Sequence, residues 1–252
     1  MPSNYYERPE WSYSQMKVIL DSGIDYAVAA KNKMLPGPSS SAIDLGQLIH
    51  NTVLGGDDKF IESPYKDYRT REAQFWREGW KNNGYIVISK EQSEIAQKAV
   101  ENIINHPHAK TYLTGADVKH EVELYAKTAD GVELRGKADA IIFHDDGKTP
   151  KTIVDIKTTS KFDTFIPTAR YKHYDLQAAT YTLLSQTNFS NYYFCVVETV
   201  EPYRVQFVHA SLEFVEAGER KLRKCIDEIV KFGDKQPNFM LEDIPELGDY
   251  SL

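Results

Sequence analysis

A change in the spacing of apolar residues divides this chain of 252 residues into a helical first part and a strand-rich second part. Within residues 95–104, apolar side chains recur at the spacing of one helix face. Later in the chain, strand-like segments are separated by turns that contain glycine, at residues 118–127, 132–143 and 152–158. Three such strands joined by short turns predict an antiparallel meander.

Helices are expected on both sides of this meander. The spacing predicts helices over residues 11–30, broken near Gly23, and over residues 41–55, and Ser89 with Gln92 marks the start of the next helix. After the meander we expect a helix, two strands and a long amphipathic helix, over residues 174–184, 192–198, 203–208 and 212–232. The fold class is therefore expected to be α/β (α+β), with a central mixed sheet of about five strands, flanked by helices, and an N-terminal helical elaboration.

Length and composition favour one large domain over residues 1–252. The chain is 41% hydrophobic and 27% charged, which is ordinary for a globular protein. We expect a mainly helical part, a sheet core, a C-terminal helix and an acidic tail, over residues 1–115, 116–210, 211–240 and 241–252.

Charge and cysteine content exclude several classes of protein. A net charge of -7 excludes a histone-like polycation, and four of these negative charges lie in the last twelve residues. Two cysteines make neither a disulfide framework nor a zinc or iron-sulfur site. No apolar run approaches the roughly 20 residues that span a bilayer, and the first ten residues do not resemble a signal peptide. We expect a cytoplasmic protein with no membrane partner.

Two aspartates and a lysine lie in the predicted meander. Asp139 belongs to the second strand, and Asp155 follows sixteen residues later, after a turn. Adjacent strands joined by that turn can bring both carboxylates to one edge of the sheet. Because side chains alternate along a strand, Lys157 lies on the same face as Asp155.

This combination matches metal-assisted hydrolysis of a phosphodiester. Two carboxylates are the usual minimum for a hard divalent cation such as Mg²⁺. A lysine beside the metal can orient or deprotonate the attacking water, since burial and nearby cations lower the pKa of an ammonium. Taken alone, these residues are more often surface charges or an ion pair. Their apolar flanks, residues 141–143 and 153–154, favour a site because an unpaired buried charge is costly.

Four motifs in order resemble the PD-(D/E)XK nuclease superfamily, and more narrowly its RecB-like and RecE-like branch. They are residues 46–50 (Gly-Gln-Leu-Ile-His), 136–139 (Gly-Lys-Ala-Asp), 153–159 (Ile-Val-Asp-Ile-Lys-Thr-Thr) and 174–181 (Tyr-Asp-Leu-Gln-Ala-Ala-Thr-Tyr). Phage recombination exonucleases of the RecE, or exodeoxyribonuclease VIII, type fit this pattern best. Ala138 departs from it, because RecB-like members more often carry a bulky apolar residue there.

The resemblance implies roles for individual residues. The implied metal ligands are His50, Asp139, Asp155 and the backbone carbonyl of Ile156. Lys157 is the implied catalytic lysine, and Gly46, one turn before His50, could admit the sheet edge or DNA. Without the other motifs, His50 would be interpreted as a hydrogen-bonded core histidine.

A glutamate near the metals is also implied on the strand before the hairpin. Glu121 and Glu123 point to the same face of that strand, so both are candidates. We prefer Glu121 as the fourth catalytic residue, because His120-Glu121 starts the strand in the family pattern.

Candidate DNA contacts lie on the basic segment after Lys157 and on the following helix. Gln177 and Tyr181 share one helix face and would contact DNA or a metal-bound water, although this face could instead pack on the sheet. The remaining candidates are Thr158, Thr159, Lys161, Arg170 and Lys172. A second DNA track is residues 65–81, where basic and aromatic residues alternate, and their aromatic residues could alternatively be core anchors.

The resemblance further implies a Mg²⁺-dependent 5′-to-3′ exonuclease on double-stranded DNA ends, with Mn²⁺ as a substitute and two ions per site. It would make 3′ single strands for recombination by annealing, act as a homo-oligomeric ring with a single-strand annealing protein as partner, and work in the cytoplasm of a bacterial host cell. The alternatives are a non-catalytic DNA-binding or assembly module, and a structure-specific or single-strand endonuclease. Intact Asp139, Asp155 and Lys157 argue against the module.

Overall fold

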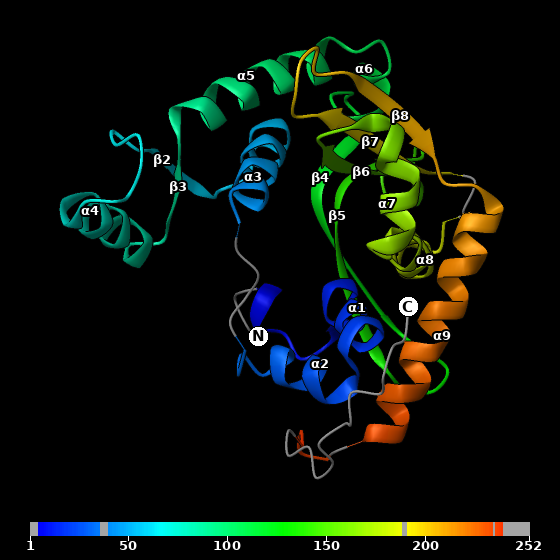
Figure 1. The fold of residues 1–252 in the computed structure, drawn as a ribbon. Helices are drawn as coiled ribbons and strands as arrows, with labels where there is room; N and C mark the ends of the chain where they lie inside the picture. The colour runs from blue at the N-terminus through cyan, green and yellow to red at the C-terminus, as the bar shows by residue number, and fades with distance from the viewer. Residues whose placement is uncertain (1–4, 36–39, 188–190, 234, 239–252) are drawn as a thin grey trace, which may run out of the picture.

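A mixed β-sheet with helices on both faces forms the body of the molecule (Figure 1). The computed structural model describes residues 5–35, 40–187, 191–233 and 235–238, so the acidic tail expected over residues 241–252 lies outside the described residues. The α/β class and the mixed sheet expected from the sequence are confirmed. No helix among the described residues is both long and apolar enough to cross a bilayer.

The helices are α1 (Tyr13–Ser22), α2 (Ile24–Lys31), α3 (Ser41–Leu54), α4 (Arg71–Asn82), α5 (Lys90–Asn105), α6 (Ala109–Tyr112), α7 (Phe165–Tyr171), α8 (Tyr174–Ser185) and α9 (Leu212–Phe232). The strands are β1 (Trp11–Ser12), β2 (Lys59–Glu62), β3 (Tyr85–Ile88), β4 (Val118–Lys127), β5 (Glu133–Phe143), β6 (Pro150–Thr159), β7 (Tyr192–Glu198) and β8 (Val205–His209). Short 3-10 turns occur at η1 (Tyr5–Glu7) and η2 (Phe162–Thr164).

The predicted meander is strands β4, β5 and β6, which pair antiparallel in sequence order. The chain then crosses through α7 and α8, so β7 pairs parallel to β6, and β8 returns antiparallel to β7. Pairing between β5 and β6 reaches Ala140 and Val154 and stops there. Beyond this pair, β5 remains paired with β4 and β6 remains paired with β7, but β5 and β6 no longer pair with each other. We call the resulting opening between β5 and β6 the fork.

Two apolar cores hold helices to the two faces of the sheet. On one face, α3 and α5 pack through Ile49 and Ile103 against Val154. On the other face, α1, α8 and α9 pack through Met16 and Leu176 against the same strands. The fork between β5 and β6 therefore lies between α3 on one side and α8 on the other.

Local signals explain where several helices start and stop. Ser89 and Gln92 form the predicted capping box at the start of α5. Gly23, with a φ of 90°, separates α1 from α2 where the sequence indicated a break. Helix α3 starts behind Ser40, whose side chain accepts a hydrogen bond from the backbone of Ile43.

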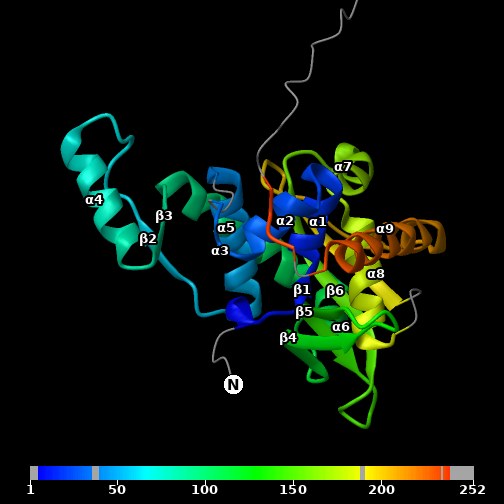
Figure 2. The same ribbon diagram turned by 90° about the horizontal axis from the view of Figure 1, so that it is seen from below.

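Residues 59–88 form an arm that the sequence did not predict as a unit. Strands β2 and β3 pair parallel, and α4 connects them. Figures 1 and 2 show the arm projecting from the body between α3 and α5. Four-residue strands within a segment of mixed charged and aromatic residues carry too short a pattern to be detected.

Helices α8 and α9 approach at a glycine. A Cβ atom added to Gly218 of α9 would lie 1.9 Å from the backbone oxygen of Asp175. Beside this crossing, the ammonium of Lys221 lies 2.7 Å from the buried Asp175 carboxylate. Since the obstacle is backbone, neither helix can yield by changing a rotamer.

We expect Gly218→Ala to lower the free energy of unfolding by about 2–3 kcal/mol, because the added methyl group forces α8 and α9 apart. Gly79→Ala in α4 is the matched control, since nothing lies within 4 Å of its added Cβ atom. It should raise stability by about 0.5–1 kcal/mol. Urea unfolding followed by circular dichroism measures both, and equal midpoints for the two variants would contradict the packing described.

Candidate active site

The fork between β5 and β6 is held open by a hydrogen bond from a backbone amide to a side chain. Oδ2 of Asp139 on β5 accepts the backbone N–H of Ile156 on β6 at 2.7 Å. This contact satisfies both groups where the strands no longer pair. Because Asp139 is buried, the bond orients its carboxylate and leaves the second oxygen for other partners.

His50 reaches that second oxygen from helix α3. Its Nε2 lies 2.9 Å from Oδ1 of Asp139. One turn earlier, a Cβ atom on Gly46 would lie 3.2 Å from the side-chain oxygen of Thr158, so the missing side chain lets α3 approach β6. The glycine and the histidine of the sequence motif thus act together. Gly46 lets α3 lie close to β6, and His50 extends from α3 to Asp139.

Glu121 completes a cluster of three potential metal ligands. It lies opposite Asp139 across the β4–β5 pair, in the register set by His120 with Ala140 and Val122 with Ala138. Its φ of 53° is the left-handed conformation, which is strained for a glutamate. One Glu121 oxygen lies 3.8 Å from Nε2 of His50, and the other contacts the ammonium of Lys137.

Glu123, the alternative to Glu121, contacts the hydroxyl of Tyr125 instead. The structure therefore places Glu121, and not Glu123, beside His50 and Asp139.

Asp155 lies on the other side of the fork, buried and held by two side chains. The amide of Gln177 on α8 donates to Oδ1 of Asp155 at 2.6 Å. Lys157 forms an ion pair with Oδ2, as the alternation along β6 predicts, but that oxygen makes no hydrogen bond. Asp155, predicted as a metal ligand, therefore stands outside the cluster of His50, Glu121 and Asp139.

Burial and neighbouring charges act in opposite directions on the two aspartates. Burial raises the pKa of Asp155 to about 6, which Lys157 opposes and Asp139 reinforces. Burial would raise the pKa of Asp139 as well, but His50, Lys157 and the Ile156 N–H outweigh it and leave that pKa below its ordinary value. Asp139 thus keeps its charge more readily than Asp155.

The carboxylates also decide the protonation of Lys157 and His50. Burial alone would lower the pKa values of both side chains. The carboxylates of Asp155 and Asp139 outweigh burial and raise the pKa of Lys157, and the carboxylate of Asp139 makes the largest contribution to the raised pKa of His50. This differs from the low lysine pKa expected from the sequence, because two carboxylates face the ammonium. Lys157 is therefore a cation here, 4.7 Å from the centre of the Tyr174 ring.

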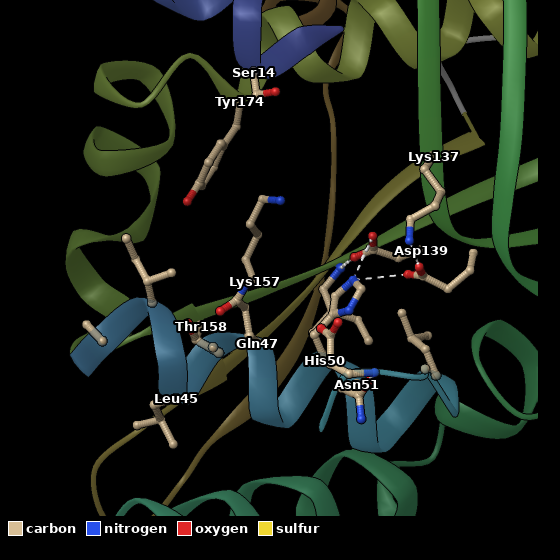
Figure 3. Close-up of a pocket in the computed structure, with 18 of the residues that line it drawn as sticks. Ser14, Leu45, Gln47, His50, Asn51, Lys137, Asp139, Lys157, Thr158 and Tyr174 are labelled. Atoms are coloured by element: carbon tan, nitrogen blue, oxygen red, sulfur yellow. Dashed lines mark hydrogen bonds and ion pairs between the residues drawn. The ribbon is translucent and has the colours of Figure 1, made fainter. Parts of the chain in front are cut away.

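These groups line a cleft of about 1420 Å³. Figure 3 shows Lys157, Tyr174 and Lys137 reaching into it from different directions, above the helix that carries Gln47, His50 and Asn51. The N-terminal segment contributes a further part of the wall, through Tyr5, Tyr6, Ser12, Tyr13 and Ser14. This volume exceeds the roughly 300–1,000 Å³ of common small-molecule pockets.

A divalent cation fits the cluster of His50, Glu121 and Asp139. One ligand atom from each lies within 4.8 Å of the other two, and the set joins an imidazole with two carboxylates. Oε1 of Glu121 is buried without a hydrogen bond, which leaves it available to a cation. Lys137 now contacts the same carboxylate, so it supplies the positive charge that a metal ion would otherwise provide.

The predicted DNA contacts divide into two groups. Thr158, Thr159 and Lys172 line the cleft, whereas Lys161 is absent from its wall. Arg170 faces away and pairs with Glu213 of α9 at 3.2 Å, because its place on α7 turns it toward that helix.

Gln177 and Tyr181 are both buried, and Tyr181 lies in the wall of the cleft. Gln177 orients Asp155, and the hydroxyl of Tyr181 donates to the backbone oxygen of Lys137 at 3.1 Å. Gly136 makes room for the Tyr181 ring, since a Cβ atom there would lie 2.8 Å from it. Both motif residues act on the site from inside the protein.

Sequence reasoning missed Lys137 and the N-terminal wall. The signal for Lys137 was present, because it precedes Asp139 by two residues and so shares its strand face. Ser12, Tyr13 and Ser14 gave no such signal: they line the cleft because β1 pairs with β5, a contact between residues more than a hundred positions apart.

We expect Glu121→Gln to weaken Mn²⁺ binding about tenfold or more, because it removes one charged ligand from the cluster. Glu123→Gln is the matched control, two residues away on the same face, and should change the affinity less than twofold. Isothermal titration with Mn²⁺ measures both. Equal losses in the two variants would contradict the assignment of Glu121.

The chain was compared with known proteins. A family model described as "PDDEXK-like domain of unknown function (DUF3799)" matches residues 12–238. The fold is similar to the crystal structure of a candidate exonuclease from Eubacterium rectale, with a TM-score of 0.63 and 15% identity, covering 94% of this chain and 88% of that chain. No curated protein matches. The resemblance to the PD-(D/E)XK superfamily is thereby confirmed, and the chain belongs to the DUF3799 family of PDDEXK-like domains.

Proposed function

We propose that this protein is a metal-dependent deoxyribonuclease that hydrolyses phosphodiester bonds. The observation that carries the proposal is the arrangement at the fork: His50, Glu121 and Asp139 converge on one point, and the buried pair of Asp155 and Lys157 lies beside it. Metal ligands next to a buried lysine in an open cleft suit hydrolysis of a phosphate ester.

Each residue has a part in that reaction. A bound divalent cation supplies a Lewis acid that stabilises charge on the phosphate oxygens. Lys157, held as a cation by Asp155, binds and orients a phosphate oxygen or the attacking water. Gln177 keeps the Asp155 carboxylate turned toward Lys157, so its role is positioning. The centre of the Tyr174 ring lies 4.7 Å from the ammonium of Lys157, and the ring restricts the positions that this ammonium can take.

The cleft walls suit a nucleic acid backbone. The cleft is lined by hydroxyl groups and an ammonium, from Ser12, Ser14, Thr158, Thr159 and Lys172. Hydroxyl and ammonium groups are common partners of phosphates in protein–DNA complexes. The net charge of -7 does not oppose this function, because carboxylates at the fork are offset by His50, Lys137, Lys157 and a metal.

The more specific proposal is a Mg²⁺-dependent 5′-to-3′ exonuclease on double-stranded DNA ends in the cytoplasm of a bacterial host cell, with Mn²⁺ able to replace Mg²⁺ and two ions per site. Its product would be a 3′ single strand for recombination by annealing, with a single-strand annealing protein as partner. The motif resemblance supports this, as does the description of the Eubacterium rectale protein as a candidate exonuclease.

We expect Asp155→Asn and Lys157→Ala each to lower the cleavage rate about 10³-fold or more, because each removes a charge at the reacting phosphate. Lys151→Ala, an exposed lysine on the same strand, should keep full activity. Release of acid-soluble label from linear duplex DNA with Mg²⁺ measures the rate, and circular dichroism checks folding. Full activity in a folded Lys157→Ala protein would refute the assignment.

The substrate experiment uses linear duplexes labelled at the 5′ or the 3′ end, together with a covalently closed circle. A 5′-to-3′ exonuclease should release the 5′ label first, leave the circle intact, and stop when EDTA removes the metal. Nicking of the circle would instead identify an endonuclease. No digestion with Mg²⁺ or Mn²⁺ would favour the non-catalytic binding module.

A ring of several copies is proposed because it would keep an exonuclease on its DNA. Sedimentation velocity at micromolar concentration should then give the mass of three or more copies of the 28.8 kDa chain. A monomer throughout the concentration range would contradict the ring and leave the nuclease assignment untouched.

A further inference from the structure

The arm, residues 59–88, has a composition unlike the rest of the chain. Seven of its thirty residues are aromatic. Six are basic and four are acidic, so the arm carries a net charge of +2 in a chain of -7. The arm lies away from the core, and the chemistry described at the fork uses none of its residues.

Most of these aromatic residues form a continuous row. The ring centres of Tyr65 and Trp76 lie 5.8 Å apart, those of Trp76 and Trp80 6.0 Å apart, and those of Trp80 and Tyr85 4.8 Å apart. Three members of the row line a hollow of about 420 Å³ on α4, whose full lining is Tyr65, Glu72, Phe75, Trp76, Gly79, Trp80 and Asn83. The Phe75 side chain is 81% exposed.

This row is not a core in the ordinary sense. Ala73 is the one residue of α4 that is buried, while Trp76 and Trp80 remain half-buried. The sequence left open whether Phe75, Trp76 and Trp80 anchor a core, and Phe75 does not. A large exposed apolar residue beside two half-exposed indole rings is typical of a surface that binds a partner or a ligand.

Basic groups without an acidic partner border the row. Among the described residues, neither Lys66, next to Tyr65, nor Arg71 pairs with a carboxylate. Arg71 precedes Phe75 by four residues, so both lie on the same side of α4. Lys81 lies on the opposite side of the helix. Aromatic faces edged by cations match bases and phosphates of a single strand.

The cleft and the arm are continuous along the chain. Gly55, Gly56, Asp57 and Asp58 line the cleft, and β2 begins at the next residue. Figure 2 shows α4 at the far end of this projection.

We propose that the arm is a binding site for single-stranded DNA, whose bases stack on Phe75, Trp76 and Trp80 and whose phosphates meet Lys66 and Arg71. The site extends the proposed nuclease function, because it would hold a strand that has separated from the duplex near the cleft. Its binding chemistry needs no metal, and so it can be tested without cleavage.

The test uses the full chain carrying Asp155→Asn, with EDTA, and a labelled 20-nucleotide single strand. Fluorescence anisotropy should show that Phe75→Ala weakens binding about tenfold, since one base loses its stacking partner. Lys66→Glu with Arg71→Glu should weaken it further at low salt and flatten its salt dependence. Tyr26→Ala, a half-exposed aromatic residue on α2, and Lys81→Glu are the matched controls, and each should change affinity less than threefold.

A second readout comes from the arm itself. In a Trp11→Phe chain the remaining tryptophans are Trp76 and Trp80, both on the arm. Their fluorescence should be quenched by the single strand and much less by a blunt duplex of the same sequence, in which the bases are already stacked.

Three results would overturn the proposal. One is unchanged affinity in Phe75→Ala, and another is the absence of tryptophan quenching. The third is a sedimentation coefficient that falls in Phe75→Ala, because the arm would then bind a second copy of this chain. If the wild-type chain still cleaves DNA in any of these cases, the nuclease assignment remains and only the single-strand site is refuted. If the chain binds a single strand at the arm but cleaves no DNA, the single-strand site remains and the nuclease assignment is refuted.

Discussion

The balance of buried charge at the fork between β5 and β6 is the constraint on which the rest of the structure depends. Asp139 and Asp155 are both buried, and a buried carboxylate without a partner is strongly destabilising. A backbone amide and an imidazole contact one carboxylate, and an amide side chain and an ammonium contact the other. Helices α3 and α8 must therefore pack where they do, since each carries one of these partners.

The balance is incomplete, and the remaining imbalance indicates function. The pKa of Asp155 stays raised, one Glu121 oxygen has no hydrogen bond, and Glu121 keeps a strained φ. A fold selected for stability alone would replace such groups with apolar ones. Their presence at one end of a large cleft agrees with a place prepared for a cation and a phosphate.

The sequence predicted the parts of this fold that repeat a local pattern. The meander, the capping box at Ser89 and the long helix α9 follow from periodicity and capping, which act over a few residues. The pairing of Asp155 with Lys157 followed from alternation in one strand. The fork was not predictable, because it depends on where β5 and β6 stop pairing. Arg170 illustrates the same limit: its charge suggested DNA, and the folded chain brings it to Glu213 of α9, which is 43 positions away in the sequence.

The contact between Gly46 and Thr158 makes one position on α3 sensitive to side-chain size. A Cβ atom at position 46 would lie 3.2 Å from the Thr158 side-chain oxygen, so a larger residue there would have to displace that side chain or move α3 away from β6. Because α3 carries His50 and β6 carries Lys157, the size of the residue at position 46 also affects the distance between the imidazole and the ammonium.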